Sequence, residues 1–117
     1  MQVRLREEAE DRWLEPGAVY VVLGIYGSQE GLGYRLLGAT EPETPAIHPA
    51  GLFEVVDPLV SPRWQIEVPG DGGSFSFEPE AWTREGFWTD FFDGDPAARQ
   101  IFDEECRLFT EQGGSDR

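Results

Sequence analysis

The segment RWQIEVPGDGGSFSFEP, residues 63–79, holds two runs in which apolar and polar residues alternate. The apolar positions are Trp64, Ile66 and Val68 in the first run and Phe75 and Phe77 in the second. Residues two apart lie on the same face of a β-strand, so each run predicts a strand with one apolar face. The turn-forming residues 69–73 between the runs predict a β-hairpin, and with it an antiparallel sheet.

The residues before this hairpin predict further strands, over 3–6, 18–26, 34–38 and 52–57. The clearest is AVYVVLGIY at 18–26, because it is rich in β-branched and aromatic residues and is bounded by turn residues. Three prolines in residues 39–51 exclude a central strand or a helix interior. We expect a loop there, with a short extended piece over 46–48.

After Pro79 the apolar residues change from a period of two to a helical period. Phe87, Trp88, Phe91 and Phe92 recur at helical spacing and predict a turn or 3₁₀ segment followed by a short helix that ends near Gly94. A second helix is predicted from Asp95, a good N-cap residue, and Pro96, which suits the first helical position, to the stop at Gly113–Gly114. Its apolar stripe contains Ala98, Ile101, Phe102, Leu108 and Phe109.

Strands followed by helices are typical of an α+β domain with an antiparallel sheet. We predict a small, strongly bent sheet, or an SH3-like barrel, of about five strands, followed by one or two C-terminal helices that close one open side. The length of 117 residues fits one domain, which we assign to residues 1–112, with 113–117 as a disordered tail.

The charge of the chain is strongly one-sided. It contains 23 acidic residues and nine basic ones, all arginine, for a formal net charge of −14. Such a charge disfavours nucleic acid and anionic membranes as partners and is compatible with a basic protein, although solubility alone also explains it. The sequence has neither an apolar run of about 20 residues nor a signal-peptide core, so we expect a soluble cytoplasmic protein.

No motif predicts a catalytic or metal site. The glycines of 27–33 lack the lysine of a P-loop, and Asp90, Asp93 and Asp95 do not have the spacing of a calcium loop. His48 and Cys106 are the single histidine and the single cysteine, so a zinc site of ordinary type and a disulfide within the chain are excluded. We therefore predict that the protein is not an enzyme and has no cofactor.

The mixture of aromatic and acidic residues near the C-terminus has two interpretations. In the structural one, a short helix covers the sheet with its rings and keeps its acids in water. In the functional one, Trp88 and Phe92 stay partly exposed as anchors inside an acidic rim that binds a partner. Residues 85–105 contain one arginine, Arg99, and seven carboxylates, namely Glu85, Asp90, Asp93, Asp95, Asp103, Glu104 and Glu105.

The first half of the chain carries a pattern with known counterparts. The matching residues are Gly17, Tyr20, Val22, Leu23, Tyr34, Arg35, Phe53, Glu54, Val55, Val56 and Asp57. This pattern resembles that of small bacterial single-domain immunity-type proteins of polymorphic or contact-dependent toxin systems. The resemblance implies a non-catalytic protein that binds and occludes a cognate toxin, and the acidic character suits a basic toxin such as a nuclease. The alternative is a stand-alone adaptor or regulatory module whose SH3-like groove is lined by Tyr20, Tyr26, Tyr34 and Trp64.

Overall fold

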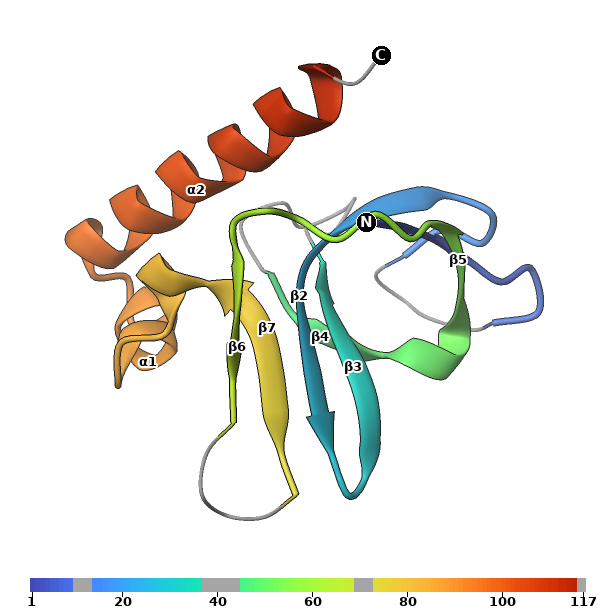
Figure 1. Ribbon diagram of the computed structural model, residues 1–117, viewed down its shortest axis with the longest axis horizontal. Coiled ribbons are helices and arrows are strands. Elements are labelled where there is room, and N and C mark those ends of the chain that lie inside the picture. The colour runs from blue at the N-terminus through green and yellow to red at the C-terminus, as the bar shows by residue number, and fades with distance from the viewer. Residues whose placement is uncertain (10–13, 37–44, 69–72, 116–117) are drawn as a thin grey trace.

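The computed structural model describes residues 1–9, 14–36, 45–68 and 73–115, and they form an α+β fold (Figure 1). The strands are β1 (Gln2–Leu5), β2 (Val19–Ser28), β3 (Gly31–Leu36), β4 (Ile47–Pro49), β5 (Phe53–Asp57), β6 (Trp64–Glu67) and β7 (Phe75–Pro79). Two 3₁₀ turns, η1 (Ala50–Leu52) and η2 (Glu80–Trp82), and two helices, α1 (Phe87–Phe92) and α2 (Pro96–Ser115), complete the order.

The seven strands form one antiparallel sheet that bends at β2. The first residues of β2 pair with β1, its last residues pair with β7, and β3 runs along its other edge, with a register shift between Val22 and Gly24. The outer strands each have one partner: β5 pairs with β1, β4 with β3, and β6 with β7. Within the described residues no pairing joins β5 to β6, so the sheet is not closed into a barrel.

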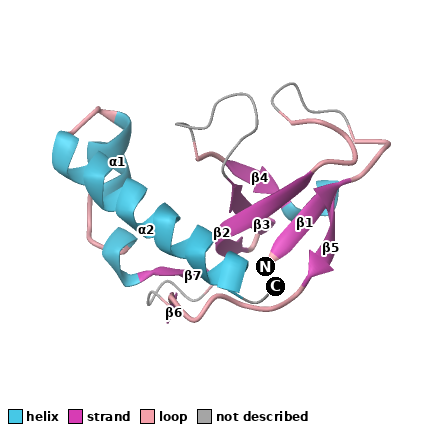
Figure 2. Ribbon diagram, turned by 90° about the horizontal axis from the view of Figure 1, so that it is seen from above, coloured by secondary structure: helices cyan, strands magenta, loops and turns pink. Residues whose placement is uncertain are grey.

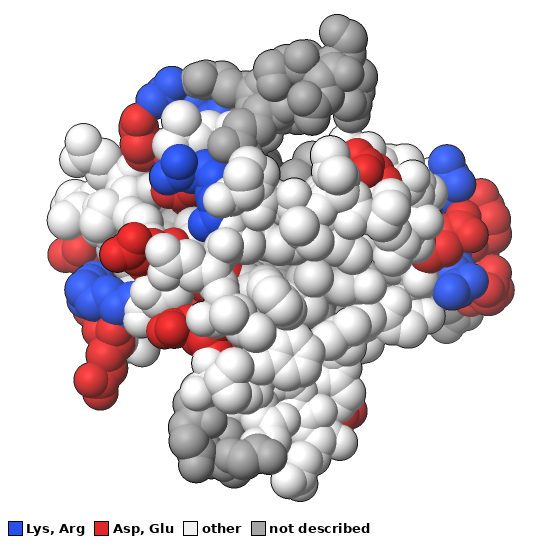
Figure 3. All heavy atoms as spheres, viewed as in Figure 1, with Lys and Arg blue, Asp and Glu red and all other residues white. Residues whose placement is uncertain are grey.

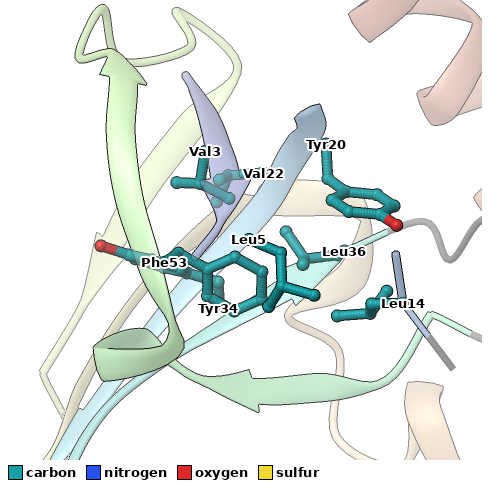
Figure 4. Packing of buried hydrophobic residues seen from close by; sticks show 8 residues of the cluster. All are labelled: Val3, Leu5, Leu14, Tyr20, Val22, Tyr34, Leu36 and Phe53. Carbon is teal, nitrogen blue, oxygen red and sulfur yellow. The ribbon is translucent and has the colours of Figure 1, made fainter. Parts of the chain in front are cut away.

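The inner face of the bent sheet holds the first hydrophobic core. Val3 and Leu5 of β1 are fully buried, as the alternation in 3–6 predicts, and side chains from β2, β3 and β5 and from the loop residue Leu14 meet them (Figure 4). The core members are Val3, Leu5, Leu14, Tyr20, Val22, Tyr34, Leu36 and Phe53. Because each strand contributes every second residue, the opposite side chains of the same strands point to the outer face.

The outer face and the helices enclose a second, largely aromatic core. It consists of Leu23, Trp82, Phe87, Phe91, Ala98, Phe102 and Phe109. The ring of Trp82 stacks on Phe102 of α2 at 5.2 Å between centroids. Figure 2 shows the helices at the left of the molecule and the strands β1 and β5 at the right. The expectation that the C-terminal helix closes the open side of the sheet is therefore wrong, because its apolar stripe is used on the outer face.

Most predicted elements are confirmed, with shifts at their ends. The hairpin is present, with Ile66 opposite Phe77, although residues 69–72 of its turn lie outside the described part. The sheet has seven strands and not about five, since the extended piece near 46–48 is β4 and pairs with β3. β3 begins at Gly31, earlier than predicted, because its first residues pair with the end of β2, with Gly31 opposite Ser28.

α2 starts where the sequence predicts, and α1 ends at Phe92, close to the predicted Gly94. The side chain of Asp95 accepts a hydrogen bond from the amide of Ala98 at 2.9 Å, which confirms the predicted N-cap. α2 continues through Gly113 and Gly114 to Ser115, so the helix end expected at the glycine pair is wrong by a few residues. Residues 116–117 of the expected tail lie outside the described part. Among the described residues, no helix combines the length and the apolar character that crossing a membrane requires.

Candidate functional site

The short helix α1 presents the aromatic residues on which the candidate site depends. Gly86, just before the helix, has a φ of +81°, and Gly94, just after it, has a φ of +87°. Both values lie in the left-handed region that glycine adopts without strain, so the chain turns sharply on each side of α1. The second turn brings the end of α1 against the start of α2, and residues 92–95 form the junction between the two helices.

The two predicted anchors lie in different surroundings. Phe92 is 51% exposed, and its ring is held by Phe91 at 5.2 Å and by Trp88 at 6.0 Å between centroids. Trp88 is half-buried, with the rings of Trp82 at 5.4 Å and Phe87 at 5.0 Å edge-on to it. Phe92 is therefore the more accessible of the two predicted anchors, and the ring of Trp88 supports it.

Trp88 also rests on a buried polar network that joins α1 to the outer face of the sheet. The guanidinium of Arg35 lies 3.8 Å from the centroid of the Trp88 ring, and its Nε donates to the hydroxyl of Tyr26 at 3.0 Å. The Arg35 NH1 group donates to the carbonyl of Pro45 at 2.7 Å, and the Tyr26 hydroxyl donates to Oε1 of Glu78 at 2.6 Å. Burial raises the pKa of both Tyr26 and Glu78.

This network was not predicted from the sequence. Arg35 and Glu78 occupy alternating strand positions that normally face water, and in most antiparallel sheets the outer face does so. The one available signal was the concentration of aromatic residues after Pro79, which can cover a second face of the sheet. A helix layer on the outer face turns these strand positions into buried ones, and Arg35 and Glu78 then require partners.

The seven predicted carboxylates divide into three groups. Asp90, Asp95 and Glu104 are engaged near the surface, Asp90 with Arg84 at 3.1 Å, Asp95 as the cap of α2, and Glu104 with Arg107. Glu105 is buried and paired through both its oxygens with Arg63. The remaining three, Glu85, Asp93 and Asp103, are exposed and form no ion pair among the described residues.

The burial of Glu105 is a correction to its expected place on the binding surface. The buried positions of α2 are Ala98, Phe102, Glu105 and Phe109, whose spacing of four, three and four residues forms a single helical face. The carboxylate is tolerated on this face because Arg63, which precedes β6, reaches it from the sheet. Glu105 therefore links the sheet to α2 and is not available to a partner.

The aromatic residues proposed as walls of an SH3-like groove are placed inside the molecule. Tyr20 and Tyr34 are buried in the first core, and Tyr26 belongs to the Arg35 network. Trp64 is half-buried, and its indole nitrogen donates to the carbonyl of Leu23 at 3.0 Å. These four rings do not form an open groove.

The residues considered for catalysis lie in packed surroundings. His48 of β4 is buried, with its ring edge-on to Phe53 at 6.4 Å. Cys106 is half-buried, and burial raises the pKa of its thiol to about 12. No cluster of three or more histidine, cysteine or acidic side chains suited to a metal ion occurs in the described parts of the chain.

The chain matches no family model, no curated protein and no solved structure. The functional argument therefore rests on the geometry of the chain itself. Within that geometry, the exposed ring of Phe92 and the unpaired carboxylate of Asp93 at the α1–α2 junction form the candidate site.

Proposed function

We propose that the protein is a non-catalytic, immunity-type protein that binds and neutralises a cognate basic toxin, such as a nuclease, through the α1–α2 junction. The observation that carries the proposal is the exposure of Phe92 directly beside Asp93. An exposed aromatic ring beside an unpaired carboxylate is the combination that tight, electrostatically steered interfaces use. We place the protein in the cytoplasm, where such a toxin would meet its target.

The aromatic rings that contact Phe92 favour this function because they hold its ring in one position. Phe91 and Trp88 contact it from below, and Trp88 is itself fixed over Arg35. A ring that is already ordered loses little conformational entropy on binding, so more of its interaction energy appears as affinity. The unpaired Glu85, Asp93 and Asp103 add to the negative field of a chain with net charge −14, which would speed encounter with a basic partner.

The resemblance noted in the sequence implies an SH3-like barrel, and the sheet formed by the described residues of this chain is strongly bent but open. We include an SH3-like arrangement in the proposal, in which β2 serves both halves of the sheet and the binding residues lie on the helices that follow it. The supporting feature is the division of β2 between β1 and β7. The alternative role, an adaptor with an aromatic groove, has less support because Tyr20 and Tyr34 are buried.

The experiment measures binding to the basic protein encoded beside this gene, together with protection of cells that express it. Phe92→Ala should weaken binding by about 30-fold, mainly through faster dissociation, because a central anchor is worth about 2 kcal/mol. The matched control is Leu59→Ala, which removes an even more exposed apolar side chain (64% against 51% for Phe92) from the loop after β5 and should change affinity less than twofold.

The electrostatic part has its own variant, in which Glu85, Asp93 and Asp103 are replaced by their amides. This triple variant should slow association and reduce its dependence on salt, while dissociation stays nearly unchanged. If the neighbouring protein does not bind, or if the wild-type chain does not protect cells from it, the proposed function is wrong. If binding occurs but Phe92→Ala and Leu59→Ala behave alike, the site is wrong.

A further inference from the structure

The inner face of the sheet is only partly covered. Near the bend it holds the first core, but toward the tips of the two hairpins its apolar side chains reach the solvent. Ile66 is 57% exposed and Val68 is 69% exposed, and Leu32 of β3 is also exposed. Figure 3 shows this side of the molecule: charged side chains gather toward the left and right, and the surface between them is largely uncharged.

Packed aromatic rings lie beneath the exposed apolar residues of this face. The half-buried rings of Phe75 and Phe77 meet edge-on at 5.9 Å, and Phe77 lies 6.5 Å from Trp64. The ring of Phe75 covers Gly27 of β2 so closely that a Cβ at this position would clash with it. The apolar surface is therefore a continuous, packed layer over β6, β7 and β2, of the kind that marks interaction sites.

Both strands beside this face have an edge without a strand partner in the described residues. β5 pairs only with β1, and β6 pairs only with β7, so each presents one row of backbone amides and carbonyls. Such an edge is a template for another extended chain, which gains main-chain hydrogen bonds along its length. Side chains of a strand alternate between its two faces, so every second side chain of a bound segment would meet the apolar layer around Ile66. The remaining side chains of the segment would point to the outer face.

The charged residues near β6 indicate which residue type a bound segment should carry at its outward positions. On the outer side of β6, Gln65 and Glu67 are exposed. The two arginines that line a hollow of about 640 Å³ beside it, Arg63 and Arg84, are each already paired with a carboxylate. An added strand with basic outward residues would complement this edge, and opposite charges on neighbouring strands are stabilising.

We propose that the free edge of β6 accepts an extended segment of a partner protein in which apolar and basic residues alternate. The apolar residues would continue the layer of Ile66 and Phe77, and the basic ones would lie beside Glu67. A second copy of this chain is a poorer occupant, because each copy carries a net charge of −14. This site is separate from the α1–α2 junction, so it does not depend on the proposed function.

The test uses a capped seven-residue peptide of alternating valine and lysine, added to the full chain labelled with ¹⁵N in 0.15 M salt. Saturable shifts of the amide signals of 65–68, with slower hydrogen exchange there, are the expected result. Two peptides serve as controls: one with the same composition in separate valine and lysine blocks, and one with glutamate in place of lysine. Each should bind at least tenfold more weakly, the first because it cannot present one apolar face and the second because its charge is repelled.

Matched variants locate the site. Ile66→Lys should weaken peptide binding at least tenfold, while Leu59→Lys, which changes charge equally at a 64% exposed leucine outside the sheet, should change it less than twofold. Phe92→Ala should leave peptide binding unchanged, which separates this site from the α1–α2 junction. Equal binding of the alternating and block peptides, or shifts confined to α1 and α2, would overturn the proposal. So would a dimer in sedimentation that Ile66→Lys dissolves, because a second copy would then occupy the edge.

Discussion

Individual ion pairs in this protein differ in how far water reaches them. Arg63 pairs with Glu105, whose side chain is 5% exposed, while Arg107 pairs with Glu104, and both of those side chains are more than half exposed. Removing one partner of a buried pair leaves a charge without compensation, whereas exposed pairs contribute about 0–1 kcal/mol. The loss of stability on removing an arginine should therefore depend on how deeply its carboxylate partner is buried.

We predict that Arg63→Ala lowers the free energy of unfolding by about 2–4 kcal/mol, somewhat below the usual range for a buried pair because water reaches Arg63 itself. Arg107→Ala makes the same change in net charge and should lower it by less than about 1 kcal/mol. Urea unfolding at pH 7 measures both values. Equal losses in the two variants would mean that Glu105 is hydrated and that its burial contributes nothing.

Glu78 gives a residue-level prediction about pH. Burial is the main reason that its pKa is raised above the ordinary value of 4.5, so the folded protein binds this proton more tightly than the unfolded chain does. The stability that the neutral carboxyl provides is complete below pH 4.5 and is lost as the pH rises through the raised pKa. The free energy of unfolding of the wild type, minus that of Glu78→Gln, should decrease from pH 5 to pH 8. Urea unfolding across this range tests the sign, and a difference that grows with pH would contradict it.

At the scale of single elements, α2 depends on its first turn. Asp95 caps it through the amide of Ala98, and no helix partner exists for that amide otherwise. Asp95→Ala should lower the free energy of unfolding by about 1 kcal/mol, and Asp95→Ser should restore most of it, because serine is also a good cap. Asp93→Ala, two residues earlier, removes the same charge without removing a cap and should have a much smaller effect. Thermal unfolding compares the three, and equal shifts for Asp93 and Asp95 would exclude a capping role.

The elements also show how far the sequence can be interpreted. Alternation predicted the β6–β7 hairpin, and the helical spacing of rings predicted α1, since both patterns follow from the geometry of one segment. The burial of Glu105 and Arg35 could not be predicted in this way. A pattern of charged and apolar residues shows which face of one element is apolar, but a buried charge depends on a partner from another element. Glu105 meets Arg63 from the sheet, and Arg35 meets Trp88 from α1.

On the scale of the whole molecule, the surplus of rings explains the arrangement. The inner face holds Tyr20, Tyr34 and Phe53 among its buried rings, and the larger aromatic group forms the second core with α1 and α2. These rings belong to η2, α1 and α2, and they are buried against one another and against Leu23 of β2 on the outer face, not over the gap between β5 and β6. The C-terminal helix does not close the sheet as expected, because the apolar stripe of a helix can pack on either face of a sheet.

Net charge is a property of the whole chain, and it predicts how salt affects stability. The radius of gyration is 14.1 Å, and about 35 Å is expected for an unfolded chain of this length, so folding brings 23 acids and nine arginines close together. The Debye length is about 30 Å at 0.01 M salt, which lets the acids repel one another across the folded molecule, and about 8 Å at 0.15 M, which does not. The exposed ion pairs, such as Arg4 with Glu54, are weakened by the same screening, but each is worth at most about 1 kcal/mol. Sodium chloride should therefore raise the urea midpoint between these two concentrations, with an unchanged slope of the transition. A midpoint that falls would show that local pairs outweigh the repulsion, and the acids would then be too well compensated to steer a basic partner.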